Sequence, residues 1–242
     1  MEIPPASFLM VYKDMKRILV VQSRVTETRI ERERENYRRT IGDRAEVSFL
    51  SALDEQLAWN APADFLKGND GVIFGGSSDF DFHGGRREDD PARIISMVIL
   101  SRTRDLISYA LENDVPVLGV CFGHQIIGQM HNGMVSNDRE QSKLGSYEVA
   151  LTEAGKSDPL FADLPERFFA QYAHKDSVTN MPDGATLLAT GSACRFSALK
   201  YGKKVYTVQF HPEVKQFRHG PDQKESPEAS KLVPRWIERM VG

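Results

Sequence analysis

The chain has 242 residues, of which 40% are hydrophobic and 27% charged, and this balance is typical of a globular protein with a sizeable core. Its formal net charge of -3 excludes a general electrostatic attraction to nucleic acid or to an anionic membrane. No apolar run approaches the roughly 20 residues of a membrane-spanning helix. The cysteines, Cys121 and Cys194, cannot build a disulfide framework, so we expect a cytoplasmic protein in a reducing compartment.

Predicted strands and helices alternate along the first 130 residues. We expect residues 1–16 to be an extension that precedes the first strand. Continuous apolar runs, which are typical of strands buried on both faces, occupy residues 18–21, 45–50, 71–74 and 115–120. The polar stretch 26–39 places Glu and Arg at spacings that allow ion pairs one turn apart, so we interpret it as a solvated surface helix rather than a nucleic-acid patch.

Further helices are expected at residues 91–112, which begin with Pro91, and at 122–130. The apolar face of the first of these would contain Ile94, Ile95, Val98, Ile99, Leu106, Ile107 and Leu111. The alternation of strands with helices predicts an open, mostly parallel sheet with helices on both faces, a three-layer α/β fold of the flavodoxin-like kind.

The second half of the chain has a different pattern, with short strand candidates separated by turn signals such as Pro182-Asp183-Gly184. These strand candidates are residues 147–151, 167–173, 185–189, 196–200 and 204–210. We interpret them as an antiparallel extension of the same sheet, so that residues 1–242 form a single domain. Residues 219–227 are expected to be a loop, and 228–241 a last helix that is disturbed near Pro234.

The strongest local motif surrounds Cys121. An apolar strand ends in Gly119-Val120-Cys121-Phe122-Gly123, and a helix pattern follows. This order is typical of a nucleophile elbow, a tight strand-to-helix turn in which glycines leave room for the exposed nucleophile. The helix N-terminus behind Cys121 would favour the reactive thiolate. The alternative is a buried structural cysteine.

A thiolate nucleophile needs a base, and the last predicted strand leads directly into His211-Pro212-Glu213. In extended chain, residues two apart project to the same side. A carboxylate at 213 can therefore hold the imidazole of His211 in one orientation and stabilise its cation. The alternative is a turn histidine beside an ordinary surface glutamate.

In this order, three blocks resemble the class I (triad) glutamine amidotransferases: Gly75-Gly76, the run from Gly119 to Gln125, and Gln209-Phe210-His211-Pro212-Glu213. The segment around His174, the Met181–Ala189 stretch and Cys194 are especially similar to the glutaminase domain of GMP synthetases and their free-standing relatives. The resemblance covers about residues 17–215 and implies a class I glutamine amidotransferase-like fold.

The resemblance also implies roles. Cys121 would attack the side-chain amide of glutamine and form a γ-glutamyl thioester. His211, oriented by Glu213, would protonate the departing ammonia and then activate water. Backbone N–H groups of Gly76 and Phe122 would form the oxyanion hole.

Substrate contacts follow from the same resemblance. Gln125 matches a residue that contacts glutamine, and Ala173 and His174 match a strand that holds its amino-acid end. For His174, a core or loop position is an equal alternative.

The sequence departs from the family pattern after Gly76, where the family commonly has proline and this chain has Ser77. The following stretch, residues 79–90, would lie beside the oxyanion loop. It is either part of the pocket wall that sets specificity or a plain surface loop. Its glycines lack the context of a phosphate loop.

We expect no cofactor and no metal, because paired zinc-ligand motifs are absent from the sequence. The expected function is hydrolysis of glutamine to glutamate, with ammonia passed to a separate synthetase chain. One alternative is a free-standing γ-glutamyl hydrolase or peptidase that acts on a larger γ-glutamyl amide. Another is a regulatory protein that has kept the fold and lost the activity. No partnership with nucleic acid or membrane is expected.

Overall fold

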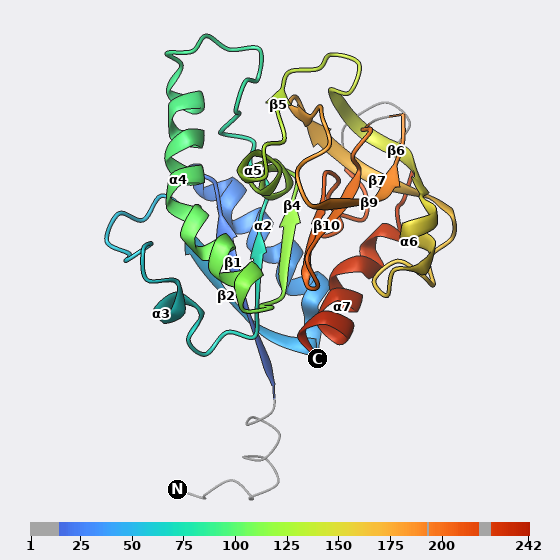
Figure 1. The fold of residues 1–242 in the computed structure, drawn as a ribbon, viewed down its shortest axis with the longest axis horizontal. Helices are drawn as coiled ribbons and strands as arrows, with labels where there is room; N and C mark the ends of the chain where they lie inside the picture. Colours follow the sequence, from blue (N-terminus) through green and yellow to red (C-terminus); the bar gives the residue numbers. More distant parts are fainter. Residues whose placement is uncertain (1–14, 193, 218–223) are drawn as a thin grey trace, which may run out of the picture.

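The computed structural model describes residues 15–192, 194–217 and 224–242. Most of the predicted N-terminal extension (1–16) and of the predicted loop at 219–227 therefore lies outside the described residues. Among the described residues the main sheet has nine strands in the order β2-β1-β3-β4-β11-β10-β9-β6-β7 (Figure 1). A small second sheet pairs β5 (Val135–Ser136) with β8 (Ser177–Val178).

One half of the main sheet is parallel. Its strands are β2 (Ala45–Ser51), β1 (Lys16–Gln22), β3 (Gly71–Phe74), β4 (Val117–Val120) and β11 (Val205–Val208). The predicted strands 18–21, 45–50 and 71–74 are confirmed. The predicted strand 115–120 begins two residues late, because the N–H of Val115 closes the end of the preceding helix on Ala110 O and Pro116 has no N–H.

The other half of the sheet is antiparallel. Its strands are β10 (Ala198–Tyr201), β9 (Ala185–Thr190), β6 (Lys143–Leu151) and β7 (Arg167–His174). The antiparallel extension is thus confirmed for these four strands. Residues 204–210 join the two halves: β11 pairs antiparallel with β10, as predicted, and in parallel with β4, Val208 beside Val120, which was not predicted. All four residues of β11 are buried, as expected for a central strand covered on both faces.

The strands carry two cores, one on each face of the sheet. Ile18, Val20, Leu118 and Val120 belong to a core that α2 (Glu27–Ile41) and α7 (Leu232–Trp236) cover. Leu19, Val21 and Phe74 belong to the other core, covered by α4 (Pro91–Glu112) and α5 (Phe122–Met130). Alternate strand residues point to opposite faces. The predicted three-layer α/β architecture is therefore confirmed (Figure 1).

Two helix predictions need correction. The apolar face of α4 is narrower than predicted, because Ile94 and Val98 are 52% and 39% exposed. A helix of 22 residues is about 33 Å long, so it extends beyond strands of four residues. The predicted helix 228–241 is divided into a 3-10 turn (Ala229–Lys231), α7 and a π-helix (Ile237–Val241). Pro234 lies in the first turn of α7, where backbone N–H groups have no acceptor within the helix, so the lack of an N–H group costs no hydrogen bond.

Three short helices had no sequence prediction. They are α3 (Pro62–Leu66), α6 (Glu153–Ser157) and a 3-10 turn at Gly42–Arg44. No helix of the part that the structure describes is long and apolar enough to cross a membrane.

Candidate active site

Cys121 occupies a strained turn between β4 and α5. Its backbone has φ 52° and ψ -96°, a conformation that L residues adopt only when the surroundings enforce it. The two glycines around it show what enforces it. A Cβ on Gly123 would lie 2.2 Å from the carbonyl oxygen of Phe74, and one on Gly119 would lie 2.9 Å from that of Gly123. The helix therefore packs so closely on the strands that the turn admits no side chain at either position.

The Gly75-Gly76 loop follows β3 and touches the elbow. The N–H of Gly123 donates to Gly75 O at 3.2 Å, which fixes the loop beside the start of α5. A Cβ on Gly76 would lie 2.8 Å from Cε1 of His211 and 3.4 Å from Cβ of Cys121. Among the described residues, the N–H groups of Gly76 and Phe122 donate to no protein acceptor. They are the donors that the sequence predicted for the oxyanion hole, and the structure brings them to the two sides of Cys121.

His211 reaches this site because β11 is parallel to β4. The N–H of Cys121 donates to Val208 O at 2.8 Å, so the carboxyl ends of the two strands lie side by side. The N–H of His211 donates in turn to Gln171 O at 2.8 Å, although β7 is the last strand in the sheet order. The antiparallel half of the sheet therefore curls back over the end of the parallel half.

The His211 ring lies between Glu213 and Cys121. Nδ1 of His211 lies 2.7 Å from Oε1 of Glu213, and both side chains are buried. Burial by itself lowers the pKa of His211. The charge of Glu213, the charge of a Cys121 thiolate and hydrogen bonds to both raise the pKa of His211 further than burial lowers it, to about 10. This arrangement stabilises an imidazolium next to a thiolate, which is the reactive form of a cysteine nucleophile.

A cavity of about 380 Å³ opens beside Cys121, and we call it the acyl cavity. Five residues that the sequence predicted for the site lie in its wall: Cys121, Phe122, Gln125, Ala173 and His174. The carbonyl oxygen of Ala173 lies 3.9 Å from Sγ of Cys121. The side-chain N–H₂ of Gln125 donates to Asp176 O at 2.7 Å, which holds the α5 side of the wall against the end of β7.

The side chain of His174 is buried, and its protonation state follows from its surroundings. Burial lowers its pKa to about 4, so the ring is neutral at pH 7. Its Nδ1 lies 3.0 Å from the carbonyl oxygen of Asp176, and a carbonyl only accepts, so Nδ1 carries the proton. Nε2 is then a bare acceptor, and it has no partner among the described residues. His174 is a buried residue that also lines the acyl cavity, and its contact with a substrate stays a prediction.

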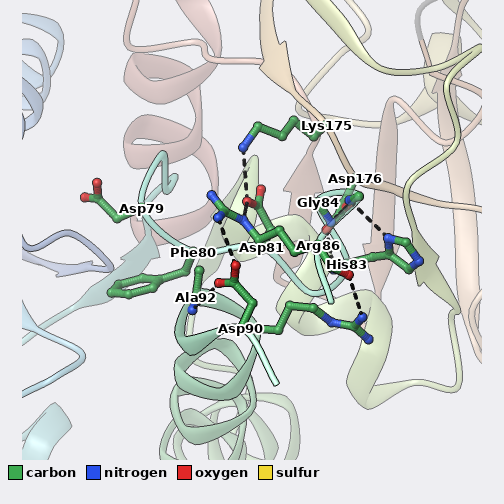
Figure 2. Close-up of polar contacts among 12 residues, drawn as sticks. Asp79, Phe80, Asp81, His83, Gly84, Arg86, Asp90, Ala92, Lys175 and Asp176 are labelled. Carbon is green, nitrogen blue, oxygen red and sulfur yellow. Dashed lines mark hydrogen bonds and ion pairs between the residues drawn. The ribbon is translucent and has the colours of Figure 1, made fainter. Parts of the chain in front are cut away.

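Residues 79–90 form a wall of the acyl cavity, to which Phe80 and Asp81 contribute. The buried carboxylate of Asp176 accepts hydrogen bonds from the backbone N–H groups of His83 at 2.7 Å and Gly84 at 2.6 Å. Asp81 pairs with Arg86 at 2.9 Å and with Lys175 at 3.2 Å. Figure 2 shows Asp176 beside His83 and Gly84, and Lys175 and Arg86 beside Asp81. The segment is thus attached to the end of β7 by charge-assisted bonds.

Sequence reasoning missed an ion pair beneath the glycine loop. Arg24, directly after β1, places Nη2 3.1 Å from Oε1 of Glu33 and Nη1 3.1 Å from Oγ of Ser78. A Cβ on Gly75 would lie 2.7 Å from the same Glu33 oxygen. Glu33 is 3% exposed, so the prediction of a fully solvated helix at 26–39 was wrong at this position. The available signal was the place of Arg24 at the carboxyl end of a parallel strand, where functional groups gather.

No group of three or more His, Cys, Asp or Glu side chains within 15–192, 194–217 and 224–242 is arranged to hold a metal ion. His124, which has a ligand-like spacing from Cys121, is fully buried and faces Oγ1 of Thr207 with Nδ1 at 2.8 Å. Burial lowers its pKa to about 3. Cys194 is buried as well, and burial raises the pKa of its thiol to about 12, which makes it a poor nucleophile.

A comparison with protein-family models identifies the family of the chain. A family model described as glutamine amidotransferase class-I matches residues 89–225, more than half of the chain, and the matched stretch contains Cys121, His211 and Glu213. The chain belongs to the class I glutamine amidotransferase family. The resemblance seen in the sequence motifs is thereby confirmed.

Similar relatives are subunits of glutamine-hydrolyzing GMP synthases from archaea. The one from Methanothermobacter thermautotrophicus is 36% identical over 122 residues. That match covers 50% of this chain and 63% of the relative, so the chain spans less than two thirds of its length. The corresponding protein of Archaeoglobus fulgidus is 29% identical over 160 residues, 66% of this chain and 74% of the relative.

Two solved structures share the amidotransferase fold. A putative GMP synthase subunit from Thermoplasma acidophilum superposes with a TM-score of 0.66 at 19% identity, covering 93% of each chain. A glutamine amidotransferase from Thermotoga maritima superposes with a TM-score of 0.57 at 21% identity, covering 92% of this chain and 81% of the other.

Proposed function

We propose that this chain hydrolyses the side-chain amide of glutamine through a γ-glutamyl thioester on Cys121. The observation that carries the proposal is the position of His211, held by Glu213 at 2.7 Å and packed against both Gly76 and the thiol side of Cys121. Nucleophilic acyl transfer requires a nucleophile, a base, a carboxylate that orients the base, and backbone donors. In this proposal all four groups belong to one site.

The reaction has two halves. The Cys121 thiolate adds to the γ-carbonyl carbon, and the N–H groups of Gly76 and Phe122 stabilise the oxyanion. As the C–N bond breaks, the imidazolium of His211 gives its proton to the leaving nitrogen, and ammonia departs. His211 then removes a proton from water, the hydroxyl adds to the thioester, and glutamate leaves as the thiolate reforms.

The acyl cavity would hold the amino-acid end of the substrate. His174 lines this cavity with a neutral ring and would lie beside the amino-acid end of the substrate. The side chain of Gln125 and the backbone at Ala173 would contribute further contacts, since both line the same cavity as Cys121.

Transfer of the ammonia to a separate synthetase chain is the second element of the proposal. It is supported by family membership and by relatives that are subunits of glutamine-hydrolyzing GMP synthase. A free-standing γ-glutamyl hydrolase is favoured by another observation: a second cavity of about 260 Å³ lies on the His211 side of the site, far larger than ammonia needs. The regulatory alternative is opposed by the presence of Cys121, His211 and Glu213 together in one site.

The test is release of ammonia and glutamate by the purified protein from glutamine and from γ-glutamyl amides. Cys121→Ala should reduce the rate by about ten thousandfold or more. Cys194→Ala is the matched control, since it removes the other buried thiol, and it should keep the rate within about twofold. Equal rates in the wild-type and Cys121→Ala proteins would overturn the proposal.

A further inference from the structure

The thiol and the imidazole face different cavities. Cys121 lines the acyl cavity, whereas His211 and Glu213 line the second cavity, which we call the His211 cavity. Ser77, Ser78 and Ala173 are in the walls of both. The two cavities therefore meet at the reacting pair, one on the side of the nucleophile and the other on the side of the base.

This division assigns the two parts of a γ-glutamyl amide to different cavities. The acyl group becomes bonded to Sγ of Cys121 and must occupy the acyl cavity. The leaving nitrogen receives its proton from His211 and must lie on the side of the His211 cavity. A volume of about 260 Å³ admits a leaving group of amino-acid size.

The His211 cavity has a cationic wall. Arg24, Arg29, Arg32 and Asn36 contribute to it from the end of β1 and from one face of α2. Arg24 is paired with Glu33, and Arg29 is paired with Asp79. Arg32 forms no ion pair with any described residue, and Nε of Arg24 is buried without a hydrogen-bond partner in the described chain. Glu33 and Glu213 also line the cavity, and they pair with Arg24 and His211, so Arg32 contributes one positive charge that no described residue compensates.

We propose that the His211 cavity binds the leaving group of γ-glutamyl amino acids, whose departing amine carries a carboxylate that Arg32 and Arg24 recognise. This inference rests on the proposed hydrolysis through Cys121 and specifies its substrate class. The balance is that of amide hydrolysis: the Cδ–N amide bond breaks, His211 protonates the nitrogen, and water supplies the hydroxyl that releases glutamate from the Cys121 thioester. The products are glutamate and a free amino acid.

The test compares γ-glutamylglycine with γ-glutamylglycinamide, which has the same size and lacks the carboxylate charge. The kcat/KM for γ-glutamylglycine should exceed that for the glycinamide, and that for glutamine, by about tenfold or more. The preference should shrink as the salt concentration rises, because exposed charges are screened. This salt series uses the wild-type protein and depends on no variant.

Arg32→Gln tests the charge directly, because Arg32 is exposed on α2 and its replacement leaves no buried partner. The ratio of kcat/KM for γ-glutamylglycine to that for the glycinamide should fall by about threefold. Arg38→Gln is the matched control: it removes the same charge from the same helix, at a residue that contacts Phe49 instead of the cavity. Its ratio should equal that of the wild-type protein.

The outcomes separate the two proposals. Equal kcat/KM for γ-glutamylglycine and its amide, with activity that still depends on Cys121, would overturn the leaving-group site and keep the hydrolase. A tenfold preference for glutamine over both would also overturn it and would indicate that the cavity is an exit for ammonia. Absence of Cys121-dependent turnover on all three substrates would overturn the proposed function itself.

Discussion

The two halves of the sheet contribute to the site by different means. The parallel half presents the ends of β1, β3, β4 and β11 at one edge, and Arg24, Gly76, Cys121 and His211 follow those ends. Their positions are set by backbone contacts so close that glycine is required at 119 and 123. The antiparallel half supplies Ala173 and His174 and the anchor Asp176, and here side-chain hydrogen bonds fix the wall.

This difference between the two halves indicates where amino-acid substitutions should be tolerated. Where two backbone segments are in contact, an added methyl group cannot rotate away from the clash. The backbone must shift instead, and the reacting atoms shift with it. Where side chains hold a loop against a strand, loss of one bond weakens the wall without moving the nucleophile. We therefore expect substitutions in the parallel half to affect kcat, and those in the antiparallel half to affect KM.

The largest effect is expected from Glu213→Gln in the parallel half. The charge of Glu213 helps to raise the pKa of His211 to about 10, so the wild-type kcat/KM should persist to about pH 10 before it falls. In the variant the pKa of His211 drops, and the alkaline limb should move toward neutral pH, with kcat about a thousandfold lower. A pH–rate profile measures both, and an unmoved alkaline limb would contradict the role of Glu213.

The same shift has a consequence for stability. Because the folded-state pKa of His211 lies above its unfolded value of about 6.5, its contribution is complete below that pH. It is lost as the pH rises toward about 10. Urea unfolding at pH 6 and pH 10 should show this loss in the wild-type protein and a smaller loss in Glu213→Gln.

Gly123→Ala should have the next largest effect. Its Cβ would lie 2.2 Å from a backbone oxygen. We expect a loss of about 3 kcal/mol in the free energy of unfolding and a kcat that is about a hundredfold lower.

Gly184→Ala is the counterpart in the antiparallel half. Gly184 has φ 68° and nothing within 4 Å of the added Cβ, so about 1 kcal/mol should be lost, with kcat retained. Equal effects of the two variants on kcat would remove the distinction between the halves.

The smallest of these effects is expected from Asp176→Asn. Replacing the charged acceptor for His83 and Gly84 should loosen the wall formed by residues 79–90 and raise KM about tenfold, with kcat changed by less than about threefold. Asp89→Asn is the control, because among the described residues the carboxylate of Asp89 pairs only with the exposed Arg87. An unchanged KM in Asp176→Asn would show that the hydrogen bonds of Asp176 to His83 and Gly84 do not affect substrate binding.

The sequence predicted the strands β1, β2, β3 and β4 well, for a physical reason. Strands buried on both faces are continuous apolar runs, and a turn that cannot hold a side chain is marked by its glycines, as at Gly119 and Gly123. Cys121 follows β4 directly, and His211 and Glu213 lie within a few residues of the end of β11. Their separation in sequence is bridged by the pairing of β11 with β4, whose parallel direction the local pattern did not reveal.

The remaining features depend on tertiary contacts that no local pattern encodes. Glu33 has the spacing of a surface residue, and its buried carboxylate is paired with Gln22 at the end of β1 and with Arg24 in the loop that follows. In the sequence Asp176 resembles an ordinary turn aspartate. Its role follows from hydrogen bonds with the N–H groups of His83 and Gly84, which are far from it in the sequence. The cationic wall of the His211 cavity likewise combines residues from a strand end and a helix face.

The most direct test of the central claim is mass spectrometry of the protein quenched with acid during turnover of glutamine or γ-glutamylglycine. We predict a γ-glutamyl adduct on the peptide that contains Cys121, and none in Cys121→Ala. Burial raises the pKa of the Cys194 thiol to about 12, so the peptide with Cys194 should stay unmodified. Product formation without an adduct on Cys121, or an adduct on Cys194, would contradict the account.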